Sequence, residues 1–366
     1  MAIEIRLTDQ HLPVSPAFID FLYQFLIKKT RKNHWHNQQS EALRNESEAV
    51  FKNAVAHVEE VSKNPVAQQT INRGYDLTLS IMFGALERLE SMQSSKKFIL
   101  VVGCPRSGGS YLTKHLFMSI NKDIEMTPGV IAHDGFPDPV PFSIQKSNNA
   151  HTTLTRHMGE YIAMAELFFS QDTPRNGFTI IPKKSTKSAY YGAFFNDVLG
   201  KNAEIILTIR HPVASCISTL EKSGGPTKDN KFKVRSNIES WIDRDIKFLS
   251  GDQDNEKQDY FDCYLKYWEN YHYSIVTSGL LANKNVQMVP FLSDHLYNMA
   301  AGFYERFSDS EQTGSRQTAI DDFITDKKQP LQSDWVSKGN EAVARVASMW
   351  KSFGHEFPVE GVLENY

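Results

Sequence analysis

The most constraining feature of this chain is an apolar run that ends in a turn rich in glycine and serine. Phe98–Gly103 reads FILVVG, Gly103–Ser110 reads GCPRSGGS, and a helix is predicted over Ser110–Ile120. A short, continuously apolar run is typical of a strand buried on both faces of a parallel sheet. Glycines after such a strand let backbone N–H groups turn toward an anion at the start of the next helix. The sequence therefore predicts a strand–loop–helix unit that binds a phosphate-like group.

Three more short apolar runs predict further strands, namely Phe178–Pro182 (FTIIP), Glu204–Ile209 (EIILTI) and Val286–Phe291 (VQMVPF). Strands separated by helices indicate right-handed βαβ units and a sheet that is covered on both faces. We therefore expect an α/β fold with a P-loop-type parallel sheet flanked by helices. Its ligands should bind beyond the carboxyl ends of the strands. Other helices are predicted over Thr152–Phe169, Val213–Lys222, Asn237–Leu249, Tyr260–Leu281 and Glu341–Phe353.

The chain of 366 residues is long enough for two structural parts. In the first part, apolar residues recur at helical spacing in Phe18–Phe25, Glu41–Val61 and Leu77–Met92, and no strand is expected. We predict a helical N-terminal extension over residues 1–95 and a catalytic α/β domain over residues 96–366. The extension should either pack on this domain or pair with a second copy to form a homodimer.

The composition excludes several classes of protein. With 40 Lys+Arg against 43 Asp+Glu, the net charge of −3 argues against a general binder of nucleic acid or of anionic membranes. The three cysteines form no CxxC pair, so neither a zinc site nor a disulfide framework is indicated. The N-terminus is polar and the apolar runs are too short to span a membrane. We expect a cytoplasmic protein with no membrane span.

The predicted strands end in cations. The loop has the frame GxxxxGK[ST], but Gly109 stands at the lysine position and the cation comes earlier, as Arg106. The second strand is followed by Lys183 and Lys184, and the third by Arg210. No strand ends in the acidic residue that holds Mg²⁺ in NTPases. This pattern predicts a metal-free site for a transferred group of lower charge than a phosphoryl, such as a sulfuryl.

A second phosphate contact is predicted after the third strand. Ser218 follows Arg210 by eight residues, and Pro212 suits the first turn of a helix between them. Arg210 would then precede the helix, with Ser218 about two turns into it. An arginine and a serine placed in this way can bind one phosphate together.

These two segments carry a family resemblance. VVGCPRSGGSYLTKHL resembles the 5′-phosphosulfate loop of the PAPS-dependent sulfotransferases. ILTIRHPVASCIST resembles their 3′-phosphate segment, with the same spacing of arginine and serine. The resemblance extends over roughly Lys97–Phe357 and is best matched in these two motifs. It implies a P-loop-related α/β fold that transfers a sulfuryl group in line from PAPS, the co-substrate, to a hydroxyl or amine of a small-molecule acceptor.

The resemblance also implies residue roles. Arg106 and the loop amides would hold the 5′-phosphosulfate, and Lys183 or Lys184 would stabilise charge on the leaving oxygen. Two departures stand out: Gly109-Ser110 replaces the family's Thr-Thr, and Ser333–Lys338 replaces a longer basic loop. The implied nucleotide-binding residues are Pro105, Arg106, Ser107, Gly108, Gly109, Ser110, Tyr111, Arg210, Ser218 and Lys338.

A general base must accept the proton of the acceptor. The candidates are His133 and Asp134 in the proline-rich loop Thr127–Phe142, where family members often place a His or Glu. His133 is preferred because the ordinary pKa of histidine lies near neutral pH. His157, on a predicted helix beside Arg156, is a further candidate. Aromatic residues that could shape an acceptor pocket are Tyr111, Phe136, Phe142, Tyr161, Phe168 and Phe169.

Two other functions fit parts of the pattern. A Mg²⁺-dependent P-loop kinase of a small hydroxyl compound would share the fold and the loop, but Gly109 stands where the kinase needs lysine. A non-catalytic helical scaffold with a relict nucleotide site is the other alternative. Binding of PAP (adenosine 3′,5′-bisphosphate) compared with ATP·Mg²⁺ separates these hypotheses.

Overall fold

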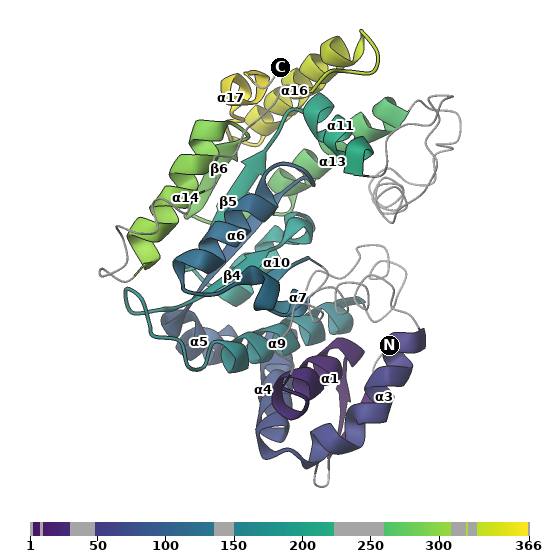
Figure 1. Cartoon of the computed structure of the whole chain (residues 1–366), viewed down its shortest axis with the longest axis vertical. Coiled ribbons are helices and arrows are strands. Elements are labelled where there is room, and N and C mark those ends of the chain that lie inside the picture. Colours follow the sequence, from purple (N-terminus) through teal and green to yellow (C-terminus); the bar gives the residue numbers. More distant parts are fainter. Residues whose placement is uncertain are drawn as a thin grey trace. The chain divides into compact units, whose positions relative to one another are not determined.

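A computed structural model describes residues 3–7, 10–29, 48–134, 150–222, 260–308, 320 and 328–364 (Figure 1). Four strands form a parallel sheet in the order β4–β3–β5–β6. They are β3 (Lys96–Gly103), β4 (Thr179–Lys184), β5 (Glu204–Ile209) and β6 (Val286–Pro290). Each lies on one of the four apolar runs, and every residue of β5 is buried. The predicted α/β architecture, a parallel sheet flanked by helices, is therefore confirmed.

The chain divides into two compact units. Unit 1 comprises Met1–Leu100, Ile120–Lys187 and Asp197–Ala203. Unit 2 comprises Val101–Ser119, Ser188–Asn196 and Glu204–Tyr366. The division falls within β3. Two elements also cross it, η4 (Thr186–Tyr190) and α10 (Gly192–Leu199).

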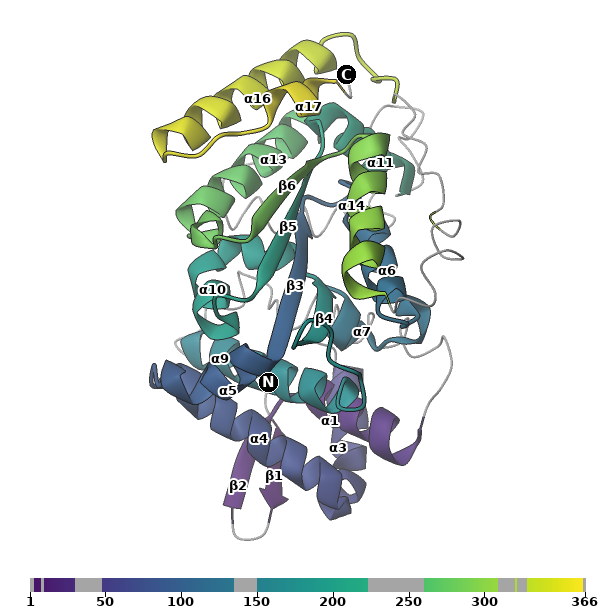
Figure 2. The same cartoon turned by 90° about the vertical axis from the view of Figure 1, so that its left-hand side faces the viewer.

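In unit 1, α4 (Pro65–Met82) packs along α9 (Ala150–Phe168) (Figure 2). Gly159 of α9 makes this approach possible, because a Cβ atom there would lie 2.7 Å from the main-chain oxygen of Gly74 in α4. The N-terminal helices therefore belong to a packed core with α9. The other helices of this unit are α1 (Pro16–Leu22), η1 (Tyr23–Ile27), α3 (Glu48–Lys63), η2 (Leu86–Leu89), α5 (Glu90–Ser95), η3 (Ile124–Met126) and α7 (Gly129–Ala132).

The expectation that no strand precedes Lys97 is wrong. β1 (Ile3–Leu7) pairs antiparallel with β2 (Gln10–Val14). In β1, Ile3, Ile5 and Leu7 are buried and alternate with exposed polar residues. This period of two is the strand signal, and it spans only five residues.

The continuous helix predicted over Leu77–Met92 is also interrupted. α4 ends at Met82, and Gly84 follows with φ 67°, a left-handed conformation that stops a helix. The chain resumes in η2 and α5. The apolar spacing continued across this turn, which is why the pattern alone did not reveal it.

In unit 2, helices cover both faces of the strands. α6 (Gly109–Ser119) and α14 (Ser293–Phe307) pack together on one face, and α13 (Tyr260–Thr277) lies on the other with α16 (Trp335–Ser352) (Figure 2). The buried indole of Trp350 joins α16 to α13 by donating to the main-chain oxygen of His272 at 3.0 Å. The remaining helices are α11 (Pro212–Lys222), η6 (Leu280–Ala282) and α17 (Val359–Leu363).

Some predictions fall outside the described residues. These are the helix over Asn237–Leu249, the candidate pocket residues Phe136 and Phe142, and the proline-rich loop beyond Asp134. In the part of that loop that is described, α7 is a helix of four residues. Throughout the described ranges, no helix combines the length and the apolar character needed to cross a membrane.

Candidate functional site

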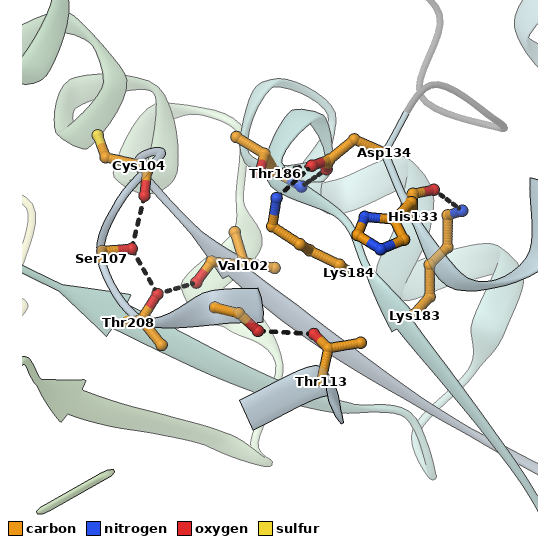
Figure 3. A network of polar contacts seen from close by, with 11 residues as sticks. Val102, Cys104, Ser107, Thr113, His133, Asp134, Lys183, Lys184, Thr186 and Thr208 are labelled. Atoms are coloured by element: carbon orange, nitrogen blue, oxygen red, sulfur yellow. Dashed lines mark hydrogen bonds and ion pairs between the residues drawn. The ribbon is translucent and has the colours of Figure 1, made fainter. Parts of the chain in front are cut away.

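The glycine-rich loop of unit 2 has a specific backbone conformation. Arg106 and Gly108 have positive φ values of 68° and 94°, in the region that costs energy for a non-glycine residue. A hydrogen-bond network fixes the turn (Figure 3): the Ser107 hydroxyl donates to the Cys104 main-chain oxygen at 2.6 Å and lies 2.7 Å from Thr208 Oγ1. Ser107 is buried, so its hydroxyl stabilises the loop conformation and is not open to a ligand. Strained residues that the surroundings hold in place are common at binding sites.

The loop is also packed too tightly for a side chain at Gly108. A Cβ atom there would lie 3.0 Å from Leu296 and 3.1 Å from Phe291. The next residue, Gly109, begins α6. The first N–H groups of a helix have no partner within it and form its positive end. The loop therefore delivers the chain to a helix N-terminus suited to an anion.

Three residues singled out in the sequence meet in unit 2. Arg106 Nε donates to Ser218 Oγ at 3.0 Å, and Arg210 Nη1 donates to the main-chain oxygen of Arg106 at 2.9 Å. The Arg210 guanidinium also lies 3.9 Å from the ring centroid of Phe291. The loop and the segment after β5, which are more than a hundred residues apart, thus form one cluster. We call Arg106, Ser218 and Arg210 the arginine cluster.

The three members of the arginine cluster differ in their exposure to solvent. Arg106 is exposed, whereas Arg210 is only 5% exposed and Ser218 4%. Among the described residues, the Nη groups of Arg106 have no hydrogen-bond partner. Guanidinium groups bind phosphate and sulfate oxygens through paired N–H donors. Arg106 can therefore present two donors to an oxyanion while Ser218 holds its Nε.

Two supports of Arg210 were not predicted. The Trp268 indole donates to the Arg210 main-chain oxygen at 3.1 Å, and Phe291 stacks on its guanidinium. Phe291 is the residue directly after β6, so its place at the end of a parallel strand was a usable signal. Trp268 lies inside α13, and nothing in the sequence links it to Arg210.

Other residues predicted to bind the nucleotide contact side chains outside the arginine cluster. Lys338, in the first turn of α16, pairs with Asp262 at 3.1 Å and with Asp334 at 3.0 Å. Hydrogen bonds to these carboxylates raise its pKa. Ser110 is exposed in the first turn of α6, and the Tyr111 ring contacts His115 edge-on at 4.5 Å.

A second cluster, in unit 1, contains His133, Asp134, Lys183 and Lys184 (Figure 3). We call it the His133 cluster. His133 is half-buried and follows α7. Lys183 is fully buried, and its ammonium donates to the main-chain oxygens of His133 at 2.6 Å and of Val130 at 3.3 Å.

Asp134 and Lys184 form the other half of this cluster. Lys184 Nζ lies 2.8 Å from Asp134 Oδ2, and the carboxylate also accepts from the main-chain N–H and the hydroxyl of Thr186. Burial by itself would raise the pKa of Asp134, but Lys184 and the Thr186 N–H lower it to about 2. A carboxylate stabilised in this way is a weak base near neutral pH.

His157, the third candidate base, is also unsuited to accept a proton. Burial and the nearby Arg156 cation lower the pKa of His157 to about 3. On the same helix, the buried Glu160 accepts a hydrogen bond from the main-chain N–H of Ser15 at 2.8 Å. Asp134 and His157 are therefore both poor bases near neutral pH, and His133 stays the proposed base.

Comparison with known proteins adds no family to these observations. No model of a known protein family matches the chain, and no curated protein matches it significantly. The resemblance to sulfotransferases therefore rests on the two motifs. Within the described ranges, no three His, Cys, Asp or Glu side chains are grouped so that they could hold a metal ion.

Proposed function

We propose that this chain is a sulfotransferase that moves a sulfuryl group from PAPS to a hydroxyl or amine of a small acceptor. The observation that carries the proposal is the arginine cluster of unit 2. A loop arginine, a serine and a second arginine come together beside the N-terminus of α6. This chemistry suits a ligand with two separate anionic groups, such as a nucleotide with 5′ and 3′ substituents.

The proposed step balances without a metal. The acceptor oxygen or nitrogen forms a bond to sulfur while the bond between sulfur and the bridging oxygen breaks, and PAP leaves with that oxygen. His133 accepts the acceptor's proton. Arg106 stabilises the charge that develops on the phosphosulfate. A sulfuryl group carries less charge than a phosphoryl group, so cationic side chains can replace the metal ions of a kinase.

Of the two adjacent lysines, we assign the charge-stabilising role to Lys184. Its side chain is 20% exposed, whereas Lys183 is fully buried. A leaving oxygen can approach only an ammonium that is open to ligand. An ammonium has three donors, so Lys184 can bind the leaving oxygen while it keeps its contact with Asp134.

Calorimetric titration with PAP in the presence of EDTA tests this proposal. We expect binding without metal, and loss of most of that binding in Arg106→Ala. Arg345→Ala is the matched control, since its described partners are Glu269 and Glu341 on the surface. Binding of ATP·Mg²⁺ in preference to PAP would support a kinase, and binding of neither would support the scaffold hypothesis.

A further inference from the structure

Lys183 is buried, although the sequence predicted a lysine that contacts the substrate. Its side chain is fully buried, and its ammonium lies 4.8 Å from the ring centroid of Tyr161. A buried ammonium is costly unless acceptors replace its water. The main-chain oxygens of His133 and Val130 supply that replacement. Lys183 is therefore bound to the protein's own backbone at the end of α7.

These oxygens belong to the last turn of a helix. The final carbonyls of a helix have no partner within it, and cations near them are favourable. The His133 N–H donates to the Gly129 oxygen at 2.9 Å, and its oxygen accepts from Lys183. Both backbone polar groups of His133 are thus held, which fixes the direction in which its imidazole leaves the chain.

Asp134, the next residue, is also bound by a lysine of β4. Asp134 binds Lys184 and the start of η4. Successive side chains of a strand point to opposite faces, so Lys183 and Lys184 leave β4 in different directions. Each of them nevertheless contacts one of two successive residues that follow α7. Lys183 holds the backbone of His133, and Lys184 holds the side chain of Asp134.

We propose that Lys183 is a positioning residue for His133. Its ammonium acts on the backbone of the base and does not touch the substrate. The proposal rests on the proposed function in one respect, namely that His133 is the general base. A base displaced by about 1 Å loses on the order of 10²-fold in rate, so this single contact would affect turnover strongly.

The test uses the full chain with histidine labelled for NMR. The imidazole signal of His133 is assigned by its disappearance in His133→Asn, and is then compared in wild type, Lys183→Met and Lys183→Arg. We expect the signal to move and broaden in Lys183→Met and to return toward the wild-type position in Lys183→Arg. Lys122→Met is the control, because its ammonium pairs with Asp172 and faces the ring of Phe168, also in unit 1.

This readout needs neither PAPS nor an acceptor, so it is separate from the test of function. With an acceptor in hand, Lys183→Met should also lower kcat about 10²-fold while the KM for PAPS stays nearly unchanged. A folded Lys183→Met with a wild-type His133 signal would overturn the positioning role. If Lys183→Met does not fold, Lys183→Gln decides, because its shorter side chain shortens the reach to the His133 oxygen but keeps a hydrogen-bond donor for the buried site. In folded Lys183→Gln, a His133 signal that moves and broadens supports the role, and a signal unchanged from wild type overturns it. Absence of PAP binding in wild type would overturn the function alone.

Discussion

At the scale of single residues, Arg210 joins two roles. It supports the loop by donating to the Arg106 main-chain oxygen, and it is the proposed reader of a 3′-phosphate. Phe291 stacks against its guanidinium, which restricts the number of orientations the side chain can take. A variant at this position must therefore be tested with two ligands, so that the two roles can be told apart.

We predict that Arg210→Ala weakens PAP much more than adenosine 5′-phosphosulfate, which lacks the 3′-phosphate. Loss of one charge-assisted contact should cost about 1.5–3 kcal/mol. Calorimetry with both ligands measures the difference. Equal losses for the two ligands would mean that Arg210 only supports the loop.

The proposed base gives a kinetic prediction. His133→Ala should lower turnover by about 10²–10⁴-fold and leave PAP affinity nearly unchanged. Wild-type turnover should rise with pH through about 6–7, where a histidine loses its proton. Because the pKa of Asp134 is lowered to about 2, Asp134→Asn should not remove this rise. A rise that survives in His133→Ala would place the base elsewhere.

Glu160 gives a prediction about stability. Burial raises its pKa to about 7, although Arg156 and Ser15 oppose the shift. The folded protein thus favours the neutral acid, and the stabilising contribution is complete below about pH 4.5 and lost as pH rises through 7. Denaturant unfolding should show that the free-energy difference between wild type and Glu160→Gln falls by on the order of 3 kcal/mol across this window. A difference that is constant with pH would contradict the raised pKa.

At the scale of elements, we predict that alanine has opposite effects on stability at two glycines. Gly108→Ala introduces a side chain at φ 94° against Leu296 and Phe291, so it should lower the melting temperature and weaken PAP binding. Gly302→Ala lies within α14, where a Cβ atom would meet no heavy atom within 4 Å. It should stabilise the protein by about 0.5–1 kcal/mol and leave PAP binding intact. The reverse order in melting temperature would show that the loop is not packed as described.

The sequence predicted those elements whose signal is local. The strands of the sheet are continuous apolar runs, and burial on both faces requires such runs. The hairpin of β1 and β2 was missed because five alternating residues are a weak pattern, and the break after Met82 because apolar residues resume beyond it. Lys183 and Lys184 were predicted at a strand end, but the sequence does not say which of the two faces is buried.

At the scale of the whole molecule, each unit holds one part of the proposed chemistry. Unit 2 contains the arginine cluster, and unit 1 contains the His133 cluster. The motifs in the sequence predicted the members of each cluster: Arg106, Arg210 and Ser218 of the first, and His133, Asp134, Lys183 and Lys184 of the second. They could not predict Trp268 or Thr208, whose contacts arise only from tertiary packing.

Sulfuryl transfer is tested most directly by a measurement that follows the sulfur atom. The protein is incubated with PAPS that carries radioactive sulfur, with EDTA and with pools of small hydroxyl and amine compounds, and label and PAP are both quantified. We expect label to move into one class of acceptor with one PAP formed per transfer, and Arg106→Ala to abolish both. No transfer from PAPS, together with transfer of labelled phosphate from ATP·Mg²⁺ to a hydroxyl compound, would show that the protein is a kinase and not a sulfotransferase.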